Sequence, residues 1–297
     1  MKLKFLNTKL KINIIKDGDF LNLGHAVVLN EEKLLTFCDD EKYIDTIKTN
    51  KNISTLICHP KMVDEFKNHN FGIISSNTPR ETFFKIHNLL IPNITKQNTL
   101  IAKDAQISKK STISEFNVKI GKNCIIEENV IIRSNVYIGD NSIIRSGSII
   151  GGEGFQFLRT TNDEILTINH YGKVLIGEGV EIKEHCSIHK AVFLWDVTMV
   201  GDFTKVDAHC HIGHGNRIGK KILLGSHTNI SGNSTINDNS YIGPGVNIPN
   251  RITIEESSKI SVGSTITKDV KANTTVSGNF AILHKKYLKH IKNINNG

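Results

Sequence analysis

"LGSHTNISGNSTINDNSYIGPGVNI", residues 224–248, carries an aliphatic side chain at every sixth position. The same step of six runs from Ile176 to Ile266 without a miss, and it recurs upstream from Ile120 to Ile150. Between these positions the chain repeatedly places Gly, Asn or Asp, the residues that tolerate the positive φ of a tight corner. A period of six fits neither an α-helix nor a long strand. It predicts a hexapeptide-repeat parallel β-helix, in which three hexads, with three short strands and three corners, make one coil.

The repeat predicts how the chain is divided. Residues 98–276 are expected to form the β-helix, with the aliphatic residue of each hexad pointing inward. Residues 151–173 break the period and are expected to leave the β-helix as a loop that lines a site. Residues 1–97 combine short apolar runs with helical apolar spacing, which predicts a small α/β domain. Residues 277–297 are expected to form one short basic amphipathic helix, either a solvated cap or a docking surface for a carrier protein.

The first domain has two predicted strands and two predicted helices. "STLICH" (54–59) and "FGIISS" (71–76) have the composition of short buried strands, whereas "DEKYIDTIKTN" (40–50) and "RETFFKIHNLLI" (80–91) have helical spacing.

Composition narrows the class of partner. Lys and Arg number 37 against 29 Asp and Glu, a net charge of +8 that is dispersed along the chain. This excess suits a phosphorylated small molecule or an acidic carrier better than nucleic acid. The five cysteines form no CxxC pair, which favours a reducing compartment. With no signal peptide and no apolar run near the ~20 residues of a membrane span, we expect a cytoplasmic protein.

The stretch "VDAHCHIGHGNRIG" (206–219) places three histidines within six positions. Alternation along a strand is expected to turn His211 outward, because its neighbours at even positions point inward. His209 and His214 fall near the corners on either side. The spacing of His209 and His214, with His189 one coil earlier, also raises the alternative of a zinc site.

His214 has a distinctive predicted environment. Each residue of a three-hexad coil stacks on the residue 18 positions away, at a spacing of about 4.8 Å. Asp196 therefore lies one coil before His214, and Gly232 lies one coil after it. An imidazole between a carboxylate and an exposed backbone N–H predicts a general base, its orienting group and an oxyanion donor. The alternatives are a solvated corner histidine, a surface aspartate and a simple turn glycine.

Three motifs together resemble a known family. "IGGEGFQF" (150–157), "GKVLIGEGVEI" (172–182) and the histidine stretch (206–219) are similar to the UDP-3-O-acylglucosamine N-acyltransferases of lipid A synthesis. The resemblance implies a left-handed β-helix and a homotrimer with active sites between neighbouring subunits. It also implies that His214 is the catalytic histidine and that the Gly232 N–H acts at the thioester carbonyl.

The resemblance further implies that the domain of residues 1–97 binds the nucleotide part of the substrate. In "TFCDDEKY" (36–43), Phe37 and Tyr43 have the spacing of the aromatic pair that sandwiches uracil in that family; the alternative is that both are core aromatics. Arg251 stands where the family has a second histidine of the sugar site. Phe155, His209 and His211 are further candidate substrate-binding residues, the two histidines as phosphate contacts.

Departures from the family change the expected substrate. This chain has "SIHKA" (187–191) where the lipid A enzymes have a different motif, and it stops at Gly297 without their long C-terminal helical segment. These differences favour related enzymes that N-acylate dTDP- or UDP-linked amino sugars for surface glycans such as O-antigen, with acyl-CoA as donor and no tightly bound cofactor. The alternative is the lipid A (lipopolysaccharide) enzyme with acyl-ACP. A metal-dependent enzyme resembling the γ-class carbonic anhydrases and a non-catalytic scaffold are the remaining alternatives.

Overall fold

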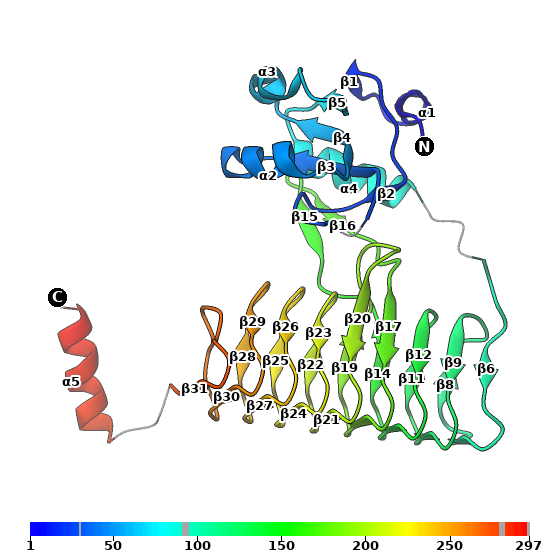
Figure 1. Cartoon of the computed structure of the whole chain (residues 1–297). Coiled ribbons are helices and arrows are strands. Elements are labelled where there is room, and N and C mark those ends of the chain that lie inside the picture. The colour runs from blue at the N-terminus through cyan, green and yellow to red at the C-terminus, as the bar shows by residue number, and fades with distance from the viewer. Residues whose placement is uncertain (30, 91–94, 279–282, 296–297) are drawn as a thin grey trace. The chain divides into compact units, whose positions relative to one another are not determined.

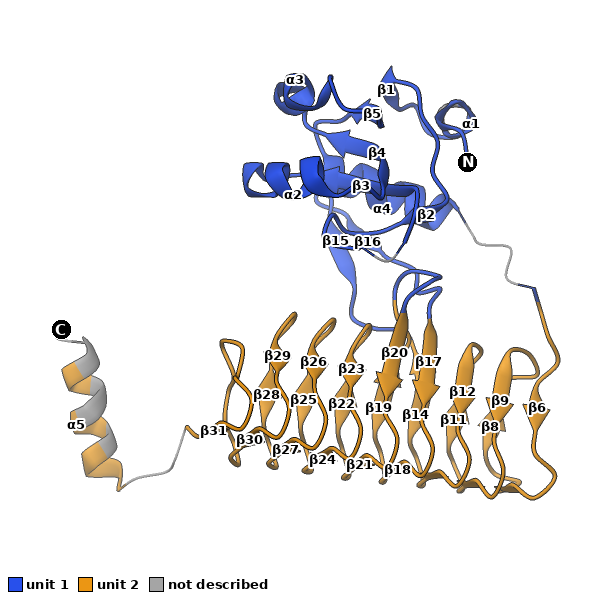
Figure 2. Cartoon of the chain, viewed as in Figure 1, with its two compact units in different colours: residues 1–95, 153–172, 192–196 blue, residues 96–152, 173–191, 197–297 orange. Residues whose placement is uncertain are grey.

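The computed structural model describes residues 1–29, 31–90, 95–278 and 283–295. The chain divides into two compact units, shown in blue and orange in Figure 2. The first unit comprises residues 1–95, 153–172 and 192–196, and the second comprises residues 96–152, 173–191 and 197–297. Within the described residues, no helix is both long and apolar enough to cross a membrane.

The second unit is a β-helix built from three parallel sheets (Figure 1). Strands one coil apart pair in parallel with a register of three hexads; Ile230, for example, pairs with Ile248. The predicted class, a left-handed parallel β-helix with a small α/β domain in the same chain, is confirmed.

The strands of the β-helix are short and belong to three sheets. The eight-stranded sheet contains β6 (Leu100–Ile101), β9 (Val118–Ile120), β12 (Val136–Ile138), β17 (Lys173–Ile176), β20 (Val197–Val200), β23 (Arg217–Ile218), β26 (Thr235–Ile236) and β29 (Thr253–Ile254). The nine-stranded sheet contains β7 (Gln106–Ile107), β10 (Ile125–Ile126), β13 (Ile143–Ile144), β18 (Glu181–Ile182), β21 (Lys205–Val206), β24 (Leu223–Leu224), β27 (Tyr241–Ile242), β30 (Lys259–Ile260) and β31 (Thr275–Val276). The seven-stranded sheet contains β8 (Thr112–Ile113), β11 (Ile131–Ile132), β14 (Ile149–Gly152), β19 (Ser187–His189), β22 (His211–Ile212), β25 (Asn229–Ile230) and β28 (Asn247–Ile248).

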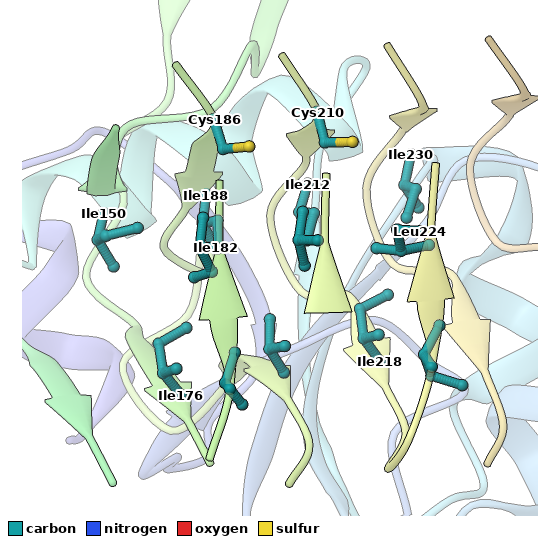
Figure 3. Close-up of a cluster of buried hydrophobic side chains, with 14 of the residues drawn as sticks. Ile150, Ile176, Ile182, Cys186, Ile188, Cys210, Ile212, Ile218, Leu224 and Ile230 are labelled. Atoms are coloured by element: carbon teal, nitrogen blue, oxygen red, sulfur yellow. The ribbon is translucent and has the colours of Figure 1, made fainter. Parts of the chain in front are cut away.

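The hexad residues form one continuous core in which each side chain stacks on its counterpart in the next coil, as Ile188 does on Ile212 (Figure 3). Cys186 and Cys210 are buried in the same core, as predicted for Cys210. The corners are held by residues with positive φ, among them Asn123 and Asn141. Asparagine suits this left-handed conformation better than most residues with a side chain, which explains its recurrence at the corners along the chain.

Two coils of the β-helix are longer than the others, and the later one contains an insertion of one hexad. Ser187 pairs with His211, so this coil spans four hexads instead of the usual three. The additional hexad includes the segment 192–196, which belongs to the first unit. The prediction that Leu194 points into the β-helix is therefore wrong, and its side chain is 43% exposed. Because the insertion has the length of one hexad, the aliphatic positions after it keep their phase.

A second excursion occurs between β14 and β17. Val136 pairs with Val174, and the chain between them is more than twice as long as an ordinary coil. The intervening residues 153–172 contain the antiparallel hairpin of β15 (Phe157–Arg159) and β16 (Ile165–Thr167), and they belong to the first unit.

The first unit has an α/β sheet with strand order β1-β5-β4-β3-β2. Strands β2 to β5 run parallel, and β1 pairs antiparallel to β5. One aromatic core cluster includes Phe83 on this unit's longest helix and Phe193 from the late segment. The elements are α1 (Leu3–Asn7), β1 (Asn13–Lys16), β2 (Asn22–Leu23), β3 (Leu34–Cys38), η1 (Glu41–Tyr43), α2 (Ile44–Thr49), β4 (Ile53–Cys58), η2 (Pro60–Met62), α3 (Val63–Phe66), β5 (Gly72–Ser75) and α4 (Pro79–Leu89). The predicted strands at 54–59 and 71–76 and the predicted helices are all present.

The C-terminal helix α5 spans His284–Asn295. It carries several lysines and lies within the segment expected to form a basic helix. Residues 279–282 and 296–297 of that segment lie outside the described residues.

Candidate active site

The outer surface of the seven-stranded sheet carries a cluster of histidines. Ile212 is buried in the core, so its neighbour His211 faces outward, as the sequence predicts. The His211 Nδ1 lies 3.0 Å from the Ser187 Oγ on the preceding coil. The ring of His189 lies 4.7 Å from that of His211, edge to face.

Sequence reasoning assigned His189 only to the alternative metal site and missed its place in this cluster. The motif "SIHKA" contains this histidine. However, a repeat of six residues does not reveal the lengthened coil that pairs β19 with β22. Burial, together with the neighbouring His211 and His214, lowers the pKa of His189 to about 4. This imidazole is therefore neutral at pH 7.

His214 follows β22 at a corner and is half-buried, which rules out a fully solvated corner histidine. Its ring lies directly against Gly232: a Cβ placed on that glycine would be 2.5 Å from both Cε1 and Nε2 of the imidazole. Burial and, to a lesser extent, the nearby His211 lower the pKa of His214. A neutral imidazole in a sheltered position has the properties that a general base requires.

Gly232 also presents backbone groups beside that imidazole. The N–H of Ser231 donates to the Ile248 carbonyl, and the N–H of Asn233 donates to the His214 carbonyl. Among the described residues, no acceptor takes a hydrogen bond from the Gly232 N–H. The Gly232 carbonyl accepts a 3.2 Å hydrogen bond from the Arg251 N–H, so Arg251 lies one coil beyond the His214 and Gly232 pair.

Asp196 belongs to the first unit, where it is buried at 9% exposure rather than lying on the surface. It directly precedes β20 in the chain. The strands that follow Asp196 and His214, β20 and β23, pair with Val200 opposite Ile218, which is the expected register of three hexads.

His209 has a different environment from the other two histidines of its motif. It is exposed, has a φ of 60°, and stacks with His185 and His227 at ring distances of 5.3 and 5.0 Å. The three form a ladder along one corner of the β-helix.

The two aromatic residues that were expected to sandwich a base pack with different core clusters of the first unit. Phe37 is 7% exposed and packs against Phe83, at a ring distance of 5.0 Å, while the Arg80 guanidinium lies 5.8 Å from its ring centre. Tyr43 packs against the other core cluster of this unit. The role of Phe37 and Tyr43 in binding a base therefore stays a prediction. Phe37 lies on β3 and faces the aromatic core, which corresponds to the alternative of a core residue.

Phe155 is 88% exposed and makes an edge-to-face contact with Phe157, with ring centres 4.9 Å apart. Both residues belong to the excursion at 153–172. Across the part of the chain that the structure describes, no group of three or more His, Cys, Asp or Glu side chains is arranged to hold a metal ion.

Comparison with known proteins agrees with this fold. Residues 117–152 match the family described as bacterial transferase hexapeptide (six repeats). A solved UDP-N-acetylglucosamine acyltransferase from Campylobacter jejuni is similar in structure, with a TM-score of 0.50 and 24% identity, over 61% of this chain and 70% of that one. At that identity, the likeness concerns the fold.

Two curated relatives carry the name that the motifs suggested. A UDP-3-O-acylglucosamine N-acyltransferase from Maricaulis maris is 36% identical over 75 residues, which are 25% of this chain and 21% of that protein. UDP-3-O-acylglucosamine N-acyltransferase 1 from Francisella tularensis is 33% identical over 110 residues, which are 36% of this chain and 31% of that protein. The resemblance indicated by the motifs is thus confirmed, and the matched region spans less than a third of either relative.

Proposed function

We propose that this protein is an N-acyltransferase that moves an acyl group from a thioester, preferably acyl-CoA, to the amino group of a nucleotide-linked amino sugar. The observation that carries the proposal is the contact between the neutral imidazole of His214 and Gly232, whose N–H has no acceptor among the described residues. The names of the curated relatives support the reaction class.

In the proposed mechanism, the sugar amine attacks the thioester carbonyl carbon, and His214 takes the proton that the amine loses. The C–N bond forms, and the Gly232 N–H stabilises the negative charge on the carbonyl oxygen. The C–S bond then breaks, and the proton passes from His214 to the departing thiolate. Asp196 is proposed to orient the imidazole, on the basis of its offset of one coil and its burial.

His211 and Arg251 are proposed to contact the sugar or its phosphates. His211 lies on the outer surface beside Ser187, and the backbone of Arg251 is bonded to Gly232, so both lie close to the reacting groups. His209 and Phe155 are proposed as more peripheral substrate contacts. A homotrimer in the cytoplasm and a role in surface glycan synthesis remain part of this proposal.

The second candidate is UDP-3-O-acylglucosamine N-acylation with acyl-ACP, which the names of the relatives favour. The test is thiol release by the purified full chain. One reaction contains short-chain acyl-CoA and a dTDP-linked 3- or 4-amino-dideoxysugar; the other contains acyl-ACP and a UDP-3-O-acylglucosamine. Turnover in the first supports the proposal, turnover only in the second supports the lipid A reaction, and turnover in neither contradicts both.

A further inference from the structure

The interior of the β-helix is polar beside the corner that carries His214. Thr198 in β20 and Asn216, which directly precedes β23, are both fully buried. β20 and β23 lie side by side in the eight-stranded sheet (Figure 1), and their register of three hexads places Thr198 beside Asn216. In the coil before Thr198 the same position is held by the buried Val174. The interior therefore changes from apolar to polar where the candidate active site begins.

The side-chain amide of Asn216 joins two successive corners of the β-helix. Its Nδ2 donates a 2.8 Å hydrogen bond to the carbonyl of Gly213, the residue before His214. Its Oδ1 accepts a 2.8 Å hydrogen bond from the N–H of Ser234, two residues after Gly232. One buried side chain thus bonds the backbone of the corner that carries the candidate base and that of the corner that carries the candidate oxyanion donor.

Thr198 holds the first of these corners from the preceding coil. Its Oγ1 accepts a 2.8 Å hydrogen bond from the N–H of Gly215, the residue after His214. Thr198 and Asn216 together bond the backbone immediately before and immediately after the candidate base. Buried polar groups that are bonded in this way make the surrounding structure rigid.

The restraint matters because His214 lies between two glycines, in the sequence "GHG" (213–215). Glycine has more backbone freedom than any other residue, and Gly215 has a φ of 69°. The local sequence alone therefore holds the imidazole weakly, and its position depends on bonds from outside the corner.

We propose that Thr198 and Asn216 are positioning residues that hold His214 against Gly232 during acyl transfer. The inference rests on the proposed function and adds two residues that act through the backbone, because their side chains lie inside the β-helix. A displacement of about 1 Å in a catalytic group lowers the rate on the order of 10²-fold, so small movements of this corner affect the reaction.

The corner held by Thr204 provides a comparison. Thr204 is fully buried and lies one hexad after Thr198. Its Oγ1 donates a 2.8 Å hydrogen bond to the Gly219 carbonyl and accepts a 3.1 Å hydrogen bond from the Ile222 N–H. These partners belong to a corner that carries none of the candidate site residues.

Thr198→Val and Thr204→Val are matched variants, because each leaves a buried backbone N–H without its acceptor. We expect similar decreases in melting temperature for the two. Thr198→Val alone is expected to lower kcat, by about tenfold to 10²-fold, while the KM for the sugar nucleotide stays within about twofold of the native value. Steady-state thiol release by the full chain measures both constants. Native kcat in Thr198→Val, or an equal loss in the two variants, overturns the inference.

Serine variants test whether the lost hydrogen bonds are responsible. Thr198→Ser keeps the hydroxyl and is expected to retain most of kcat. Asn216→Val is expected to lose as much as Thr198→Val, and Asn216→Ser is expected to recover part of that loss. Ser240 shows that serine can bond both coils, because its Oγ lies 3.0 Å from the Asn237 carbonyl in its own corner and 3.2 Å from the Glu255 carbonyl in the next coil. Equal kcat in the serine and valine variants contradicts the positioning role.

A measurement without substrate separates this inference from the proposed function. Deuterium exchange at the imidazole Cε1, followed by mass spectrometry, gives the pKa of His214 in each variant. Burial lowers this pKa in the native chain, so a loosened corner that admits water should raise it towards 6.5 in Thr198→Val and leave it unchanged in Thr204→Val. An unchanged pKa in Thr198→Val contradicts the positioning role. Absence of thiol release by the native chain contradicts the proposed function and leaves the pKa test of the corner intact.

Discussion

The imidazole of His214 rests on the Cα of Gly232, so closely that no side chain fits on that glycine without displacing the ring. This contact joins two successive coils, and it exists because the β-helix places residues three hexads apart next to one another. Its functional meaning can be tested by adding a single methyl group.

Gly232→Ala is expected to lower kcat/KM on the order of 10²-fold, because a misplacement of about 1 Å in a catalytic group has an effect of that size. Gly278→Ala is the matched control, since a Cβ there meets nothing within 4 Å. Steady-state thiol release measures both variants. Equal activity of the two would show that the position of the His214 ring is not critical.

His214→Ala is expected to lower turnover roughly 10²- to 10⁴-fold, the usual contribution of a positioned general base. The melting temperature of the variant checks that the fold is intact. A loss smaller than tenfold would mean that another group accepts the proton from the amine.

The pH dependence of kcat/KM follows from the state of His214. Its pKa lies below the ordinary value of 6.5, so the base stays neutral from pH 8 down to pH 6.5, and the rate is expected to be level over that range. The rate should fall only at lower pH, as the imidazole takes up a proton. The rate is first corrected for the protonated fraction of the sugar amine, whose pKa is measured on the free substrate. A corrected rate that still declines above pH 7 contradicts the assignment of this histidine as the base.

His189 is expected to make the fold sensitive to acid. Its pKa is about 4 in the folded protein and near 6.5 in the unfolded chain, so the unfolded chain binds the proton first. The stability that the neutral ring contributes is complete above pH 6.5 and is lost as the pH falls towards 4. Thermal melts between pH 7 and pH 4.5 should show a smaller decrease for His189→Gln than for the native chain. Identical slopes would show that His189 is not held in its neutral form.

Two of the aliphatic residues that recur at every sixth position should differ in their importance for stability. Ile188→Ala removes a fully buried core side chain and is expected to cost about 2–5 kcal/mol. Leu194→Ala, at the next position of the series, changes a side chain outside the β-helix and is expected to cost about 0.5 kcal/mol or less. Denaturant unfolding measures both, and similar losses would contradict the departure of residues 192–196 from the β-helix.

The sequence alone was sufficient for the fold, because the inward aliphatic position of each hexad is a strong local signal. It was sufficient for the contact of His214 with Gly232 as well, since the register of three hexads is unbroken after β20. Sequence analysis wrongly predicted that Leu194 points into the β-helix, because an insertion equal to one hexad preserved the period of six. For the same reason it missed the place of His189 in the histidine cluster. The packing of Phe193 against Phe83 was also beyond sequence analysis, because the two residues come from segments far apart in the chain.

Because the insertion has the length of one hexad, the inserted segment can change without altering the register of the β-helix. If residues 190–195 were removed, the coil would return to three hexads, and every later hexad would still face inward. The same change would remove Phe193 and Trp195 from the first unit. Evolution can therefore remodel the aromatic core cluster of the first unit by lengthening or shortening this excursion in whole hexads, while the scaffold that positions His214 stays in register.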